Sequence, residues 1–177
     1  LCVNPAETYV KVKAADGYTY YMAEALCDTV LGKLADEEAG TKAYEVLETY
    51  KGKDLEYKEY EPLFDCAVDI CEKQHKKGYY VTCADYVTGV VHIAPAFGED
   101  DAQVGRKYDL PFVQLVNGKG EMTKETPYEG VFVKKADPMV LKDLEEKGLL
   151  FDAPKFEHSY PHCWRCDTPL IYYARES

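Results

Sequence analysis

The segment from Gly89 to Asp101, GVVHIAPAFGEDD, constrains the fold more than any other stretch of the chain. It predicts a buried strand first, because Val90, Val91 and Ile93 are β-branched. Pro95 has no backbone N–H and should end that strand. A tight turn of small and apolar residues follows, and then a run of acidic residues that is expected to begin a helix. The segment therefore predicts a strand, a turn and a helix in close succession.

This segment also carries an imidazole and, nine residues later, a carboxylate. Side chains alternate along a strand, so His92 would share a face with the small residues Val90 and Ala94. Asp101 at a helix start would suit an ammonium group, because charge-assisted hydrogen bonds are strong. From the residues alone, Asp101 could instead only satisfy helix N–H groups, and His92 could be a hydrogen-bonded core histidine. The arrangement favours a pocket for a small ligand.

The composition limits the classes of protein to which this chain can belong. A length of 177 residues, 46% of them apolar, suits one domain with a substantial core. The net charge of −11 argues against a broad surface that binds nucleic acid. If RNA is a partner, this chain should contact only a short end of the RNA. Seven irregularly spaced cysteines, with neither a signal peptide nor an apolar run of about 18 residues, predict a cytoplasmic protein without membrane contact.

The hydrophobic pattern predicts about seven short strands and three helices in mixed order. The expected strands span 7–13, 18–22, 44–50, 79–83, 89–93, 110–116 and 128–133, and the expected helices 22–34, 101–108 and 137–147. The first two strands should form a hairpin across Asp16 and Gly17. Strands that do not alternate with long helices disfavour a doubly wound sheet. An α+β fold centred on a β-barrel fits better.

Four segments resemble the editing domain of isoleucyl-tRNA synthetases, which are class I aminoacyl-tRNA synthetases. They are LCVNPAETYV at the start, YEPLF from Tyr60, HIAPAFGEDD from His92 and HSYPHCWRCDTPLIYYAR from His158, in the family's order. The resemblance implies the β-barrel-centred editing domain shared by valyl-, isoleucyl- and leucyl-tRNA synthetases, here over residues 1–157. Residues 158–177 would form a connector that returns to the catalytic body.

The resemblance also implies an activity, namely hydrolysis of valine wrongly attached to tRNA(Ile), with isoleucine excluded by size. Asp101 would receive the α-amino group, His92 would gauge the side chain, and water would attack the ester. The remaining substrate-binding residues would be Thr88, Gly89, Val90, Ala94, Pro95, Ala96, Phe97 and Gly98. The partners would be the valine-bearing 3′ end of tRNA(Ile) and the rest of the synthetase. No cofactor is expected in this domain; the parent enzyme would use ATP.

Two features depart from the family pattern. The segment from Cys83 to Gly89 is shorter than expected, which puts the alignment of Thr88 in doubt. In the family, a threonine-rich strand, TTTPWTLP, precedes LCVNP and positions the hydrolytic water. This chain begins after that strand, so we expect weak or absent hydrolysis by the chain alone.

Cys163 and Cys166 form a C-x-x-C pair, which is half of a four-ligand structural zinc site. In the family the partner pair lies upstream of the insertion, and His158 or His162 could supply a ligand here. Two reduced cysteines without metal are the simpler alternative. Two other functions also stay open: the editing domain of a valyl- or leucyl-tRNA synthetase, and a non-catalytic docking module that depends on zinc.

Overall fold

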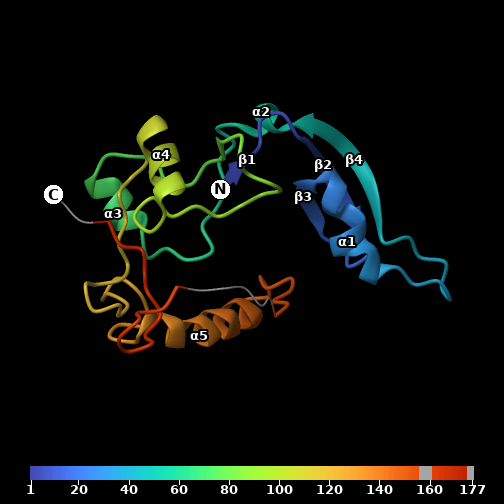
Figure 1. Ribbon diagram of the computed structural model, residues 1–177. Helices are drawn as coiled ribbons and strands as arrows, with labels where there is room; N and C mark the ends of the chain where they lie inside the picture. Colours follow the sequence, from blue (N-terminus) through green and yellow to red (C-terminus); the bar gives the residue numbers. More distant parts are fainter. Residues whose placement is uncertain (156–160, 175–177) are drawn as a thin grey trace. The chain divides into compact units, whose positions relative to one another are not determined.

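The computed structural model describes residues 1–155 and 161–174 (Figure 1). The chain divides into two compact units, each built from two segments. Unit 1 combines Leu1–Tyr60 with Tyr79–Ile93, and unit 2 combines Glu61–Gly78 with Ala94–Ser177. The boundary predicted between residues 157 and 158 lies outside the described residues.

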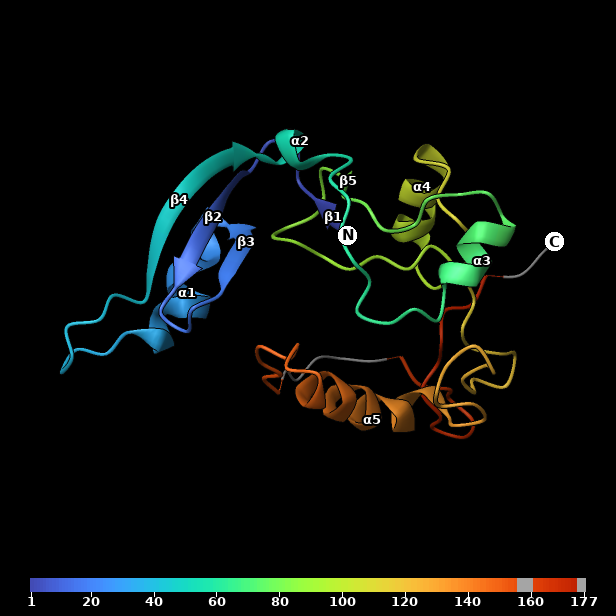
Figure 2. The same ribbon diagram turned by 180° about the vertical axis from the view of Figure 1, so that it is seen from behind.

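A three-stranded antiparallel sheet dominates unit 1, with strand order β3-β2-β4. Its strands are β2 (Thr8–Ala14), β3 (Thr19–Ala23) and β4 (Tyr44–Lys51). The predicted hairpin is confirmed, and Gly17 takes a positive φ of 89° in its turn, a conformation that glycine adopts without steric cost. Figure 2 shows the long, curved β4 running beside β2.

The predicted helix over residues 22–34 is present as one short α-helix between two 3-10 turns. These elements are η1 (Glu24–Leu26), α1 (Cys27–Leu31) and η2 (Gly32–Leu34). Cys27 and Leu31 point into a buried cluster with Val10 and Val12 of β2. Met22, Val30 and Leu34 of the apolar pattern pack against this cluster, whereas Leu26 is exposed. The helix thus covers one face of the sheet mainly through Cys27 and Leu31.

A second, smaller sheet in unit 1 has β1 (Cys2–Val3) at its centre. β1 pairs in parallel with β5 (Thr82–Cys83), and on its other side Cys2 exchanges both backbone hydrogen bonds with Val91. The strand expected from Gly89 is therefore wrong, because it is reduced to this single bridge. The strand expected over 79–83 is shortened to β5 in the same way. β1 has only two residues that can pair, so neither β5 nor the segment around Val91 can form a longer ladder with it.

Asn4 ends β1, and Tyr9 fastens that end to β2. The Asn4 side chain accepts the Ala6 N–H at 3.0 Å, which turns the chain away from the sheet. The fully buried Tyr9 hydroxyl accepts the Asn4 N–H at 2.9 Å and donates to the Gly89 carbonyl at 2.8 Å. One phenol therefore links β2, β1 and the entry to the HIAPAFGEDD motif. The helical turn α2 (Gly52–Leu55) follows β4 and packs against the same end.

Unit 2 consists of helices connected by turns. Its helices are α3 (Val68–Lys73), α4 (Glu99–Lys107) and α5 (Val133–Glu146). The strands predicted over 110–116 and 128–133 are wrong, because only the bridges Val116–Met122 and Glu121–Phe132 remain of them. Asn117 accepts the N–H groups of Lys119 and Glu121 and folds the first segment into a turn. The helix predicted from Asp101 is confirmed as α4, which begins two residues earlier, at Glu99.

Helix α5 begins four residues before its predicted start at Asp137. Pro138 lies inside the helix instead of at its first turn and therefore removes one intrahelical hydrogen bond. The helix ends before Gly148, as predicted, where φ is 67°. Tyr128 donates a hydrogen bond to Asp143 and ties α5 to the preceding loop.

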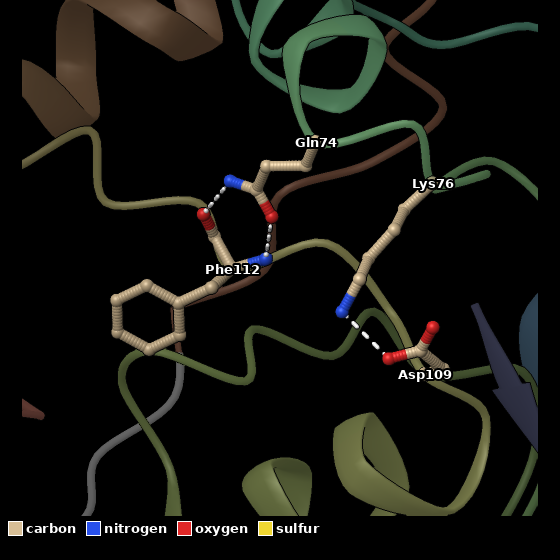
Figure 3. Close-up of polar contacts among 4 residues, drawn as sticks. All are labelled: Gln74, Lys76, Asp109 and Phe112. Carbon is tan, nitrogen blue, oxygen red and sulfur yellow. Dashed lines mark hydrogen bonds and ion pairs between the residues drawn. The ribbon is translucent and has the colours of Figure 1, made fainter.

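A side-chain clamp fastens the chain after α4 to the end of α3 (Figure 3). Gln74 donates to the Phe112 carbonyl at 2.7 Å and accepts the Phe112 N–H at 2.8 Å, as a neighbouring strand would. Lys76 forms an ion pair with Asp109 at 2.6 Å. The two Gln74 hydrogen bonds satisfy the backbone N–H and carbonyl of Phe112, which a strand over 110–116 would have satisfied by pairing.

The fold class is therefore mixed α and β, with five α-helices rather than three among the described residues. Neither sheet in the described part of the chain closes into a barrel, so the β-barrel expectation is corrected. The reason is that three predicted strands find at most isolated bridges. No helix in the described ranges is long and apolar enough to cross a membrane.

Candidate functional site

The HIAPAFGEDD motif forms a tight loop that leads directly into α4. Phe97 donates its N–H to the Ala94 carbonyl at 2.9 Å, which closes a turn around Pro95. Gly98, extended at φ −150°, precedes the first helical residue. The first helical turn then carries three acidic side chains, where the helix dipole favours negative charge. These are Glu99, Asp100 and Asp101.

The Asp101 carboxylate folds back over this turn. Its Oδ2 accepts the Ala94 N–H at 2.9 Å, and the contact is partly buried. A Cβ on Gly98 would lie 3.0 Å from the same oxygen, so the absence of a side chain there lets the carboxylate approach. Asp101 therefore bonds a backbone N–H of the loop that lies outside α4. The loop fixes the direction in which this carboxylate points.

Helix α4 packs on the loop through a glycine that sequence reasoning missed. A Cβ on Gly105 would lie 2.9 Å from the Cβ of Pro95, so only glycine permits this separation. The Gly105 carbonyl also accepts the Leu110 N–H at 2.8 Å. Gly105 lies one helical turn after Asp101, and a small residue at that spacing was the available signal.

The other candidate residues before the loop belong to unit 1. His92, Thr88 and Val90 are exposed, and Gly89 is buried with φ 74°. Because the segment does not form a strand, the expected common face of Val90, His92 and Ala94 is wrong. His92 lies in unit 1, whereas Ala94, Pro95, Ala96, Phe97, Gly98 and Asp101 lie in unit 2. Within unit 2 the structure brings Ala94, Gly98 and Asp101 into contact.

Cys163 and Cys166 lie together on a tight turn of unit 2. Asp167, at φ 53°, donates its N–H to the Cys163 carbonyl at 2.9 Å, and the Cys163 backbone N–H donates to the Thr168 carbonyl at 2.9 Å. The Cys166 sulfur lies 3.2 Å from the Thr168 hydroxyl. That hydroxyl, followed by the Thr168 N–H and the Cys163 thiol, lowers the pKa of Cys166.

Two adjacent thiols, one of them with a lowered pKa, are suited to binding zinc because the thiolate is the ligand. Among the described residues, no cluster of three or more histidine, cysteine or acidic side chains has the spacing of a metal site. His162 is exposed beside this turn, and His158 lies outside the described residues. Cys163 and Cys166 could thus supply two of the four ligands that a structural zinc site needs.

Cys166 is expected to react with iodoacetamide at a lower pH than Cys27, whose pKa is raised by burial. A lowered pKa gives more thiolate, the nucleophile, at a given pH. Thr168→Val removes the first hydrogen bond to the sulfur and should move the midpoint of the Cys166 rate profile to higher pH. Site-resolved mass spectrometry over a pH series measures both midpoints. An unchanged Cys166 midpoint in Thr168→Val would contradict the role of the hydroxyl.

The chain was also compared with known proteins. No protein-family model matches it. Isoleucine–tRNA ligases are similar over the whole chain, at 46% identity in Clostridium acetobutylicum, 45% in Clostridium novyi and 43% in Bacillus thuringiensis. The chain spans only 16% of the length of each of these relatives. From end to end, the chain is therefore similar to one segment of these isoleucine–tRNA ligases.

Proposed function

We propose that this segment is the editing domain of an isoleucine–tRNA ligase and hydrolyses valine misattached to tRNA(Ile). Isoleucine and valine differ by one methylene, and this pair is the standard illustration that such a difference is worth only about 1–3 kcal/mol in an apolar pocket. A synthetic site alone therefore charges some tRNA with valine. A second site that admits only the smaller side chain removes the error.

The observation that carries this proposal is the fixed carboxylate of Asp101, within a chain that matches isoleucine–tRNA ligases throughout. Its Oδ2 is held by the Ala94 N–H at 2.9 Å. A carboxylate held in one direction can receive the α-ammonium group of an aminoacyl ester without first losing rotamer freedom. The turn around Pro95 consists of small and apolar residues, and Asp101 bonds this turn whereas Asp100 of the same helical turn is exposed.

The other assignments follow the motif. His92 would contact the side chain of the amino acid and limit its size, and water would attack the ester carbonyl without a covalent enzyme intermediate. The whole ligase would join isoleucine to tRNA(Ile) with ATP in the cytoplasm. The rest of that chain would supply most of the affinity for tRNA, because the segment itself carries a net charge of −11.

The test is deacylation of Val-tRNA(Ile) by the full-length ligase that contains this segment. We expect His92→Ala to admit the larger side chain, so that the preference for Val-tRNA(Ile) over Ile-tRNA(Ile) falls about tenfold or more. The matched control is His75→Asn in unit 2, an exposed histidine whose φ of 55° asparagine tolerates. An unchanged preference in His92→Ala would remove this residue from size selection. Faster hydrolysis of Thr-tRNA than of Val-tRNA would favour a valyl-type editing domain.

A zinc-dependent docking module is the second candidate, and the Cys163–Cys166 turn supports it. Cys163, Cys166 and two ligands from elsewhere in the ligase would hold the ion and fix the connector. Zinc content of the full-length ligase and binding of a valyl-adenosine analogue separate the two functions. Bound zinc without analogue binding would favour docking alone.

A further inference from the structure

We propose that Gln114, acting with Tyr173, is a positioning residue for the Asp101 carboxylate. The proposal rests on the proposed function, since it concerns how the same carboxylate is aimed at an ammonium group. Gln114 follows α4 by seven residues, and Tyr173 lies near the C-terminal end of the described chain. Neither residue belongs to the HIAPAFGEDD motif.

Hydrogen bonds connect Gln114 to the loop through the backbone of Ala174. The Gln114 side chain donates from Nε2 to the Ala174 carbonyl at 2.9 Å. Ala174 in turn donates its N–H to the Ala96 carbonyl at 3.1 Å. Ala96 is the centre of the turn and only 1% exposed, so this bond satisfies a buried carbonyl. Gln114 therefore fixes the backbone of Ala174, and Ala174 in turn fixes the loop at Ala96.

A ring contact reinforces the same connection. Tyr173 packs edge-on against Phe97, with ring centroids 6.0 Å apart and planes at 67°. Its hydroxyl lies 3.5 Å from Oε1 of Gln114, which is a weak hydrogen bond. The two ends of the Gln114 amide thus engage adjacent residues, Tyr173 and Ala174. These residues contact adjacent loop residues.

The loop is consequently held on two sides within unit 2. Gly105 of α4 packs against Pro95, while Tyr173 and Ala174 bind the next two residues of the loop. Ala94, whose N–H orients the Asp101 carboxylate, precedes Pro95 directly. A misplacement of about 1 Å at a positioned group can cost about 100-fold in activity. Loss of the Gln114 hydrogen bond to Ala174 should therefore shift the Asp101 carboxylate, although the two side chains make no direct contact.

The test uses the full-length ligase and two probes, a non-hydrolysable valyl-adenosine analogue and its 3-methylbutanoyl counterpart, which lacks the amino group. We expect Gln114→Ala to weaken binding of the amino analogue about tenfold, equivalent to ~1.4 kcal/mol, and to leave the des-amino analogue unchanged. Gln114→Glu keeps the size but loses the donor, and should behave in the same way. Tyr173→Ala removes the ring that packs against Phe97 and should weaken binding of the amino analogue in the same selective way.

The effect of Gln114→Ala is also measured in the Asp101→Asn variant, which lacks the charge. If Gln114 acts through the charge of Asp101, Gln114→Ala should have no further effect on the amino analogue in Asp101→Asn. Asn117→Ala, which removes an amide bonded to Lys119 and Glu121, controls for general loosening of unit 2. Equal weakening of both analogues, effects like those of Asn117→Ala, or additive losses would overturn the role of Gln114. If Asp101→Asn alone leaves the amino analogue unaffected, the proposed function itself fails.

Discussion

Asp101→Asn is expected to reduce the affinity of the full-length ligase for a valyl-adenosine analogue by roughly 30-fold or more. Removing one partner of a hydrogen-bonded charge pair costs about 2–5 kcal/mol, and about 1.4 kcal/mol corresponds to a factor of ten. Asparagine can still accept the Ala94 N–H through its side-chain oxygen, so this substitution removes the charge while it preserves the loop. Calorimetric titration measures the effect.

Asp101→Ala removes both the charge and the hydrogen bond to Ala94, so binding should be abolished. Asp100→Asn is the matched control, because Asp100 is exposed in the same helical turn and should bind the analogue normally. Unchanged affinity in Asp101→Ala would remove Asp101 from its role. A comparable loss in Asp100→Asn would instead assign the effect to the charge of the helix start as a whole.

Gly52→Ala is expected to destabilise unit 1 by more than about 4 kcal/mol, which is exceptional for one methyl group. A Cβ at Gly52 would lie 1.9 Å from the Asn4 carbonyl oxygen, 2.7 Å from its carbon and 3.0 Å from the Tyr9 ring. The nearest neighbours are backbone atoms at the end of β1, and Tyr9 is fully buried and hydrogen-bonded there. None of these groups can move without breaking the junction of β1, β2 and α2.

Gly32→Ala provides the matched control for this prediction. A Cβ at Gly32 would meet nothing within 4 Å, and its φ of −54° suits alanine. This substitution should be neutral or slightly stabilising, because alanine restricts the unfolded chain. Urea unfolding followed by circular dichroism compares the two variants. A free energy of unfolding in Gly52→Ala within about 1 kcal/mol of that in Gly32→Ala would contradict the close approach of Gly52 to Asn4.

The elements that the sequence predicts correctly depend on residues that lie close together in the sequence. The hairpin of β2 and β3 follows from alternating side chains and from Gly17, and β4 follows from the same alternation. The apolar spacing over residues 22–34 predicts a helix that packs near Val10 and Val12, although its buried side chains are Cys27 and Leu31. The helix start at Glu99 follows from its acidic residues and from Pro95. In each case the deciding residues lie within one turn or one hairpin of each other.

The strands that were predicted wrongly depend on distant partners. Residues 89–93, 110–116 and 128–133 have apolar and β-branched side chains, but such a pattern does not show what lies beside them. Val91 meets only the two-residue β1, and Phe112 is bound by the side chain of Gln74 instead of a strand. The isolated bridges that result do not extend into a barrel.

The sequence by itself selected Asp101 as the candidate carboxylate through its resemblance to isoleucyl-tRNA synthetase editing domains, and it predicted the turn before Asp101 because turn residues are a local property. Only the tertiary structure showed that Asp101 is aimed by Ala94, that Gly105 admits Pro95, and that Ala174 binds Ala96. The physical reason is that these contacts join surfaces whose fit depends on atomic distances. Residue types along one chain do not specify those distances until distant segments have packed together.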